Sequence, residues 1–207
     1  MSEMREAILR EATQLFADQG YEGTSLNDIA AGVGIRRPSL LHHFSSKDSL
    51  YEEVFETMLS EWFDRLDSAV LQPGDGWQKF SGVIAAGFDH FAGNPAYVRL
   101  MRREALDGGH RLAIDLTAVV KPYVESAVTW LNEEMSRGTF RQHDARQVVV
   151  SAYGALLSFF SDYPFLSGLF PNSETDEALL TERRDHVLSF LRCALVADTQ
   201  EPRTTLV

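Results

Sequence analysis

The sequence is poor in cysteine, with Cys193 as its one copy among 207 residues. A single cysteine forms neither an internal disulfide nor a multi-cysteine metal site, so packing alone must stabilise the fold, as suits a reducing cytoplasm. Cys193 lies in an apolar helical pattern and is expected to be a small buried side chain. Long apolar runs are also missing. The longest uncharged stretch, residues 147–161, is shorter than the roughly 20 residues of a membrane span, and it predicts a buried helix.

Several other signatures are missing. The first 20 residues mix charged and apolar side chains, which is not the pattern of a secretory signal. The 14 glycines and 7 prolines are too few for a collagen-like or low-complexity chain. The sequence contains no G-x-S-x-G, H-E-x-x-H, P-loop or dinucleotide glycine fingerprint. We therefore expect a folded protein that is not an enzyme, binds no cofactor and stays in the cytoplasm away from membranes.

Basic residues are scarce, and the formal net charge of −11 argues at first against a nucleic-acid partner. Their distribution changes that conclusion. Residues 1–47 carry five basic and six acidic side chains, and the segment 36–47 holds three basic side chains and no acidic one. A local basic patch of this kind is enough for a short DNA-recognition element.

Apolar side chains recur at helical spacing along almost the whole chain, and no segment alternates as a strand would. Ser25 with Asp28, and Ser45 with Asp48, have the three-residue spacing of helix-capping boxes. We predict an all-α fold of about nine helices. Their expected ranges are 4–20, 26 to about 33, 37 to about 44, about 48–71, 77–93, 95–106, 112–137, 144–161 and 175–197.

Two short helices joined by a glycine-containing turn, after an amphipathic helix, are typical of a helix-turn-helix unit, although similar units also occur as inert domains. The identities of the residues point to a specific family of such units. The segments TSLNDIA (24–30), GIRRPSLLHHF (34–44) and SKDSL (46–50) resemble the N-terminal signature of the tetracycline-repressor (TetR) family of transcriptional regulators. One departure is Leu41, where this family usually has a tyrosine whose hydroxyl can contact a phosphate.

The resemblance implies a homodimer that binds a palindromic operator in double-stranded DNA. It predicts a DNA-binding domain over residues 1–47 and a helical ligand-binding and dimerisation domain over residues 48–207, linked by the helix at about 48–71. The expected function is a repressor that an unidentified small apolar or aromatic ligand releases from its operator. The alternative is an all-helical interaction protein that uses its N-terminal unit to contact other proteins.

The predicted DNA contacts lie at helix starts and on the second short helix. Arginine can bind guanine O6 and N7 in bidentate fashion, and helix N-termini attract phosphate. Capping explains the two hydroxyl groups equally well, the arginines could be solvated surface charge, and one histidine could simply pack. Two adjacent histidines point about 100° apart on a helix and do not suggest a metal site. The candidates are Thr24, Ser25, Arg36, Arg37, Ser39, His42, His43 and Lys47.

Two further sets come from the C-terminal region. Most aromatic side chains there belong to the core, but a subset could line a ligand pocket between helices. The pocket candidates are Phe88, Phe91, Tyr97, Met101, Tyr123, Trp130 and Phe159. The last two long helices carry strongly apolar stripes, which would face the core of a monomer or pair with a second copy. The interface candidates are Val148, Leu156, Leu180, Val187, Leu188, Leu191 and Leu195.

Overall fold

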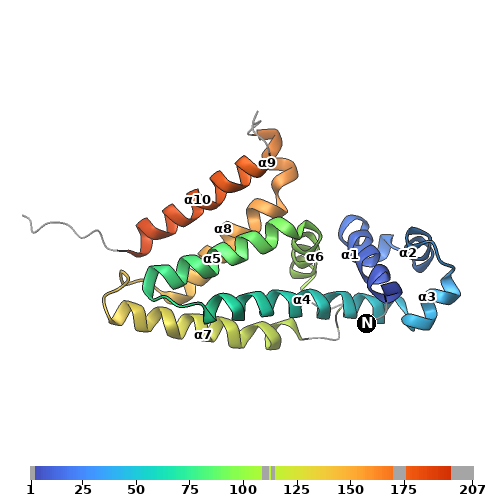
Figure 1. The fold of residues 1–207 in the computed structure, drawn as a ribbon, viewed down its shortest axis with the longest axis horizontal. Coiled ribbons are helices and arrows are strands. Elements are labelled where there is room, and N and C mark those ends of the chain that lie inside the picture. Colours follow the sequence, from blue (N-terminus) through green and yellow to red (C-terminus); the bar gives the residue numbers. More distant parts are fainter. Residues whose placement is uncertain (1–2, 109–111, 113–114, 170–175, 197–207) are drawn as a thin grey trace, which may run out of the picture.

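The computed structural model describes residues 3–108, 112, 115–169 and 176–196, which form ten helices and, within these ranges, no strand (Figure 1). The predicted all-α class is confirmed. The helices are α1 (Glu3–Gly23), α2 (Leu26–Val33), α3 (Arg37–His43), α4 (Lys47–Leu71), α5 (Gly76–Gly93), α6 (Pro95–Leu106), α7 (Leu116–Ser136), α8 (Ala145–Ser161), α9 (Tyr163–Leu169) and α10 (Asp176–Leu195).

Helices α1, α2 and α3 form a small head at one end of the molecule (Figure 1). Ile8 and Phe16 of α1 are fully buried and belong to the same core cluster as Ile29 of α2 and Leu40 of α3. The helical path of α1 is interrupted at Gly20, whose φ of 75° is a left-handed value that favours glycine. The predicted stop at this glycine is therefore a kink inside a longer helix.

Helix α4 connects the head to the rest of the molecule. Figure 1 shows it running from the head along the body, with α7 beside its far half. The expected cap at Ser45 is wrong: the N-cap is Ser46, whose hydroxyl accepts a hydrogen bond from the backbone N–H of Ser49 at 3.0 Å. All the buried side chains of α4 lie in its first half, between Leu50 and Leu59.

The body consists of α5 to α10. The predicted count of about nine helices misses α9. Pro164, between the predicted helices 144–161 and 175–197, suggests a break, but proline is tolerated in the first turn of a helix, where it stands in α9. No single described helix is long and apolar enough to cross a membrane. Only the pair α8 and α9 together reaches that length and composition, and these two helices meet at 76°.

Helix α10 packs against the other helices of the body through apolar side chains at every fourth position: Val187, Leu191 and Leu195 are buried. Cys193 lies two residues after Leu191 and is exposed, so the prediction that it is buried is wrong. A position two residues along a helix is rotated by about 200°, which turns the thiol away from the core.

Candidate nucleic-acid interface

Local hydrogen bonds fix both ends of α2 and so set the geometry of the helix-turn-helix. Ser25 Oγ accepts a hydrogen bond from the backbone N–H of Asp28 at 3.2 Å, and the Asp28 carboxylate accepts one from the backbone N–H of Ser25 at 3.3 Å. The predicted capping box is therefore present. At the other end Gly34 adopts φ 78° and ψ 25°, and its N–H donates to the carbonyl of Ala31 at 3.0 Å. This left-handed residue ends α2 and sets the direction in which α3 leaves.

Helix α3 is anchored from its inner side and exposed on its outer side. Leu40 is 0% exposed and Phe44 is 3% exposed, so the helix is held by apolar packing. Arg36, Arg37 and Ser39 are all exposed, and neither arginine makes an ion pair with a described residue. The two guanidinium groups are thus free to contact a base edge or a phosphate.

Thr24 and Ser25 have their hydroxyl groups engaged within the head. Thr24 is 2% exposed, and its hydroxyl donates to the carbonyl of Gly20 at 2.8 Å. The Ser25 hydroxyl donates to the carboxylate of Asp28 at 2.6 Å. These bonds fit the capping alternative, and they stabilise the α1–α2 turn and the start of α2.

Lys47 is the first residue of α4, where unpaired backbone N–H groups favour an anion. Its Nζ lies 4.1 Å from the centre of the Tyr21 ring, and the Tyr21 hydroxyl donates to the Asp48 carboxylate. This cation–π contact holds the ammonium group beside the helix start. Tyr21 was missed at the sequence level, because nothing in the spacing indicates a contact between residues 26 positions apart.

The remaining predicted contacts lie towards the end of α3. His42 is exposed and His43 is half-buried, while the neighbouring Leu41 is 39% exposed and offers an apolar surface. Across the described part of the chain, no three His, Cys, Asp or Glu side chains are grouped so that they could hold a metal ion. The exposed face of α3 therefore combines two arginines, a serine and a histidine around one apolar side chain.

Comparison with known proteins decides the family. Residues 8–54 match the bacterial regulatory proteins of the tetR family, and residues 78–191 match the tetracyclin repressor-like C-terminal domain, a span longer than half of the chain. The chain belongs to the TetR family. This is a family of DNA-binding transcriptional regulators and not of enzymes, so the predicted class of function is confirmed.

Individual relatives match over shorter spans. The chain is 34% identical over 101 residues to the HTH-type transcriptional repressor KstR2 of Mycolicibacterium smegmatis, which is 49% of each protein. It is 40% identical over 68 residues to the biofilm operon icaADBC negative regulator IcaR of Staphylococcus aureus, 33% of this chain and 34% of IcaR. The aligned region thus spans about half of KstR2 and a third of IcaR.

Solved structures show the same fold over almost the whole chain. KstR2 of Mycobacterium tuberculosis, described as a ketosteroid transcriptional regulator, superposes with a TM-score of 0.73 at 24% identity, covering 96% of this chain and 97% of that one. AibR in complex with isovaleryl coenzyme A and operator DNA has a TM-score of 0.72 at 19% identity, covering 91% and 97%.

In this TetR-family regulator the predicted pocket residues fall into separate groups. Phe88 faces Phe159 at 6.4 Å between ring centres, and Phe91 faces Tyr97 at 5.9 Å. Phe160 contacts both Phe88 and Phe91, at 5.0 and 6.2 Å, and so joins these four rings into one cluster. The half-buried Met101 packs against the same core.

Tyr123 and Trp130 lie elsewhere. Tyr123 stacks on Phe63 of α4 with ring centres 4.1 Å apart, and Trp130 meets Phe140 edge-on at 5.9 Å. Helix α7, which carries both residues, presents them to different neighbours. The structure therefore brings together four of the six predicted rings.

A polar side chain lies beside the aromatic cluster. His90 is 1% exposed, and its ring centre lies 5.0 Å from that of Tyr97 and 5.1 Å from that of Trp62. Burial, and to a lesser degree the positive charge of Arg65, lowers the pKa of His90 to about 4. Its Nε2 has no hydrogen-bond partner among the described residues. His90 is therefore a neutral, buried imidazole with an unused polar atom.

A groove lies apart from the aromatic cluster. It has a volume of about 720 Å³, opens between α4 and α5, and is lined by charged side chains such as Glu61, Asp64, Arg65 and Lys79. The predicted aromatic residues are not part of this lining. In the aromatic cluster itself Phe88, Phe91 and Tyr97 are buried, and Phe159 is half-buried.

The predicted interface residues lie mostly inside the protomer. Leu156 of α8 and the three α10 residues Val187, Leu191 and Leu195 are buried. The other three predicted residues are half-buried: Val148, Leu180 and Leu188. Other apolar side chains on the same two helices point outward: Val150 is 61% exposed, Tyr153 49% and Phe190 62%.

Proposed function

We propose that this TetR-family protein is a repressor that binds a palindromic operator as a homodimer and leaves it when a small apolar molecule binds the body. The observation that carries this proposal is the outer face of α3, where Arg36 and Arg37 are exposed and unpaired above the buried anchors Leu40 and Phe44. A helix of this kind can enter the major groove and bind guanine through its first residues. KstR2 and IcaR, the relatives compared above, are described as a repressor and a negative regulator.

Selection from a random DNA pool tests this function. The purified full-length protein should enrich a palindrome whose half-sites lie about one helical turn apart, because two identical heads read the two halves. A protein-interaction module would enrich no symmetric sequence. A cytoplasmic location follows from the proposal, since the target is chromosomal DNA.

Dimerisation is proposed to use the outward faces of α8 and α10. Val150, Tyr153 and Phe190 leave apolar surface exposed there, and a second copy would cover it. Because Leu191 and its neighbours in the stripe already pack inside the protomer, the interface is assigned to these exposed side chains. The proposed domain division at residue 47 fits the same arrangement, with the heads at one end and the dimer surface on the body.

The ligand is proposed to enter beside the aromatic cluster of Phe88, Phe91, Tyr97 and Phe159, where His90 offers a hydrogen bond. Phe88, Phe91 and Tyr97 are buried, so a ligand that reached them would displace their helices and favour a different shape. AibR, which shares the fold, is described in complex with isovaleryl coenzyme A, an acyl compound. An apolar molecule with one hydrogen-bonding group fits this chemistry.

Thermodynamic reciprocity tests the ligand response. A ligand that weakens operator binding must itself bind more weakly, by the same factor, when operator DNA is present. Typical coupling of about 1–3 kcal/mol corresponds to a 5- to 150-fold change. Titration calorimetry of a screened ligand, with and without the selected operator, measures that factor. Equal affinities in the two titrations would contradict the allosteric part of the proposal.

A further inference from the structure

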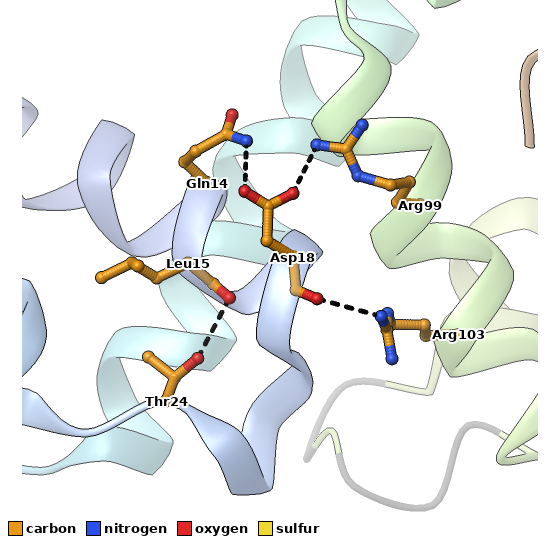
Figure 2. A network of polar contacts seen from close by, with 6 residues as sticks. All are labelled: Gln14, Leu15, Asp18, Thr24, Arg99 and Arg103. Carbon is orange, nitrogen blue, oxygen red and sulfur yellow. Dashed lines mark hydrogen bonds and ion pairs between the residues drawn. The ribbon is translucent and has the colours of Figure 1, made fainter. Parts of the chain in front are cut away.

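Helix α6 is tied to α1 of the head by two arginines one helical turn apart. Arg99 Nη2 lies 2.9 Å from the carboxylate Oδ1 of Asp18, and Arg103 Nη2 donates to the backbone carbonyl of the same residue at 3.3 Å (Figure 2). Gln14 donates to the other carboxylate oxygen of Asp18 at 2.7 Å. One residue near the end of α1 therefore receives three polar contacts, two of them from the body.

A third contact from α6 is buried. Glu104 is 1% exposed, and its Oε2 accepts a hydrogen bond from the hydroxyl of Tyr51 at 3.1 Å. Tyr51 itself packs edge-on against Phe16 of α1, with ring centres 4.9 Å apart. The second carboxylate oxygen of Glu104 is buried and has no hydrogen-bond partner among the described residues. A buried carboxyl with one unbonded oxygen carries a desolvation cost. The bond to Tyr51 offsets part of that cost and connects α6 to α4.

The attachment point lies next to the turn that leads to α2. Asp18 precedes Gly20, the residue with φ 75° at which the path of α1 bends. The Thr24 hydroxyl donates to the carbonyl of Leu15 (Figure 2) and is also within hydrogen-bond distance of the carbonyl of Gly20, so it ties the end of α1 to the start of α2. A displacement of α6 would thus reach the helix-turn-helix through only a few rigid residues.

The orientation of the head is more restricted by two attachments to the body than by a single one. Helix α4 alone would join the head to the body through a single rod, whose far half packs on the body through Trp62 and Phe63. The contacts of Arg99 and Arg103 with Asp18 supply a second attachment of the head. Glu104 acts less directly, through Tyr51 of α4, which packs on Phe16 of α1. Orientation matters because one base pair of spacing changes the distance between half-sites by about 3.4 Å and their rotation by about a tenth of a turn.

We propose that Arg99, Arg103 and Glu104 are positioning residues that fix the orientation of the head on the body and thereby select the operator spacing that the dimer accepts. They act through Asp18 and Tyr51 and do not touch DNA. The inference rests on the proposed function, because it requires a dimer on a palindrome. It adds a specificity determinant outside the helix-turn-helix.

The test compares operators of three lengths. The operator selected by the wild-type protein is prepared with its natural spacing and with one base pair added to or removed from the centre. Fluorescence anisotropy then gives the dissociation constants for the full-length protein, for Arg99→Gln/Arg103→Gln and for Tyr51→Phe. Arg102→Gln is the matched control, since Arg102 lies on the same helix between the two arginines and, among the described residues, makes no hydrogen bond or ion pair with α1.

The readout is the ratio between the affinity for the operator of natural spacing and the affinity for each operator of altered spacing. Wild type and Arg102→Gln should discriminate strongly against the altered spacings, while the double variant and Tyr51→Phe should lose discrimination by about fivefold or more, the lower end of typical coupling. A merely structural role would weaken all three operators by one common factor, and that result would overturn the inference. Tyr51→Phe removes only a hydroxyl, so an unchanged ratio in that folded variant would also count against it. If the wild type selected no palindrome, the proposed function and this inference would both fail.

Discussion

His90 offers the sharpest quantitative prediction, because its environment favours one protonation state. The imidazole is 1% exposed among aromatic rings, and burial lowers its pKa from 6.5 to about 4. In the unfolded chain the pKa returns to its ordinary value. Between these two values the unfolded state binds a proton that the folded state does not, so acidification must favour unfolding.

The size of the effect follows from the shift. One pKa unit corresponds to about 1.4 kcal/mol, so the loss of stability is about 3 kcal/mol at pH 4 and has an upper limit of about 3.4 kcal/mol at still lower pH. At pH 5 the expected loss is about 2 kcal/mol. Above about pH 7.5 the imidazole is neutral in both states, and His90 adds no further pH dependence.

Urea unfolding followed by circular dichroism measures this loss at pH 7.5 and pH 5. Carboxyl groups add pH dependence of their own, so the informative quantity is the difference between the wild type and His90→Phe. That variant should lose about 2 kcal/mol less stability than the wild type on acidification. His42→Gln, a change at an exposed position of α3, is the control and should behave like the wild type. The same acid-induced loss in His90→Phe and the wild type would refute the reasoning.

Two further predictions concern DNA binding and assembly. Lys47→Ala should weaken binding to all sequences alike and reduce the slope of log K against log salt by about 2, since a dimer carries two copies; an unchanged slope in anisotropy titrations would exclude a phosphate contact. Phe190→Glu should place a charge on the exposed face of α10 and favour monomers, while the exposed Glu182→Gln on the same helix should not. Sedimentation velocity checks this, and a wild-type protein that is a monomer of about 23 kDa at micromolar concentration would contradict the interface.

Local rules predicted the head well, because its decisive signals lie within a few residues of one another. Ser25 and Asp28 form the expected capping box. The apolar spacing of α3 predicts that Leu40, Leu41 and Phe44 face inward; this is correct for Leu40 and Phe44 and wrong for Leu41, which is 39% exposed. The cap of α4 was placed one residue early, because Ser45 with Asp48 and Ser46 with Ser49 have the same spacing. Only the packed structure distinguishes the two registers.

The body was harder to predict, since a periodic pattern shows which face of a helix is apolar but not which helix covers it. Tyr123 is predicted to line the pocket together with Phe88, yet its partner is Phe63 on α4. The apolar stripe of α10 turned out to face its own protomer, which leaves Phe190 outside. Contacts such as Arg99 with Asp18, 81 residues apart, leave no local signature.

The central claim is that the exposed face of α3 reads DNA, and Arg37→Ala tests it most directly. The variant and the wild type should both be used to select binding sites from a random DNA pool. Loss of the guanidinium should cost about 1–3 kcal/mol per contact and relax the preference at one position in each half-site, leaving the palindrome otherwise intact. Identical selected sequences for the two proteins, or no enriched palindrome with the wild type, would contradict the account.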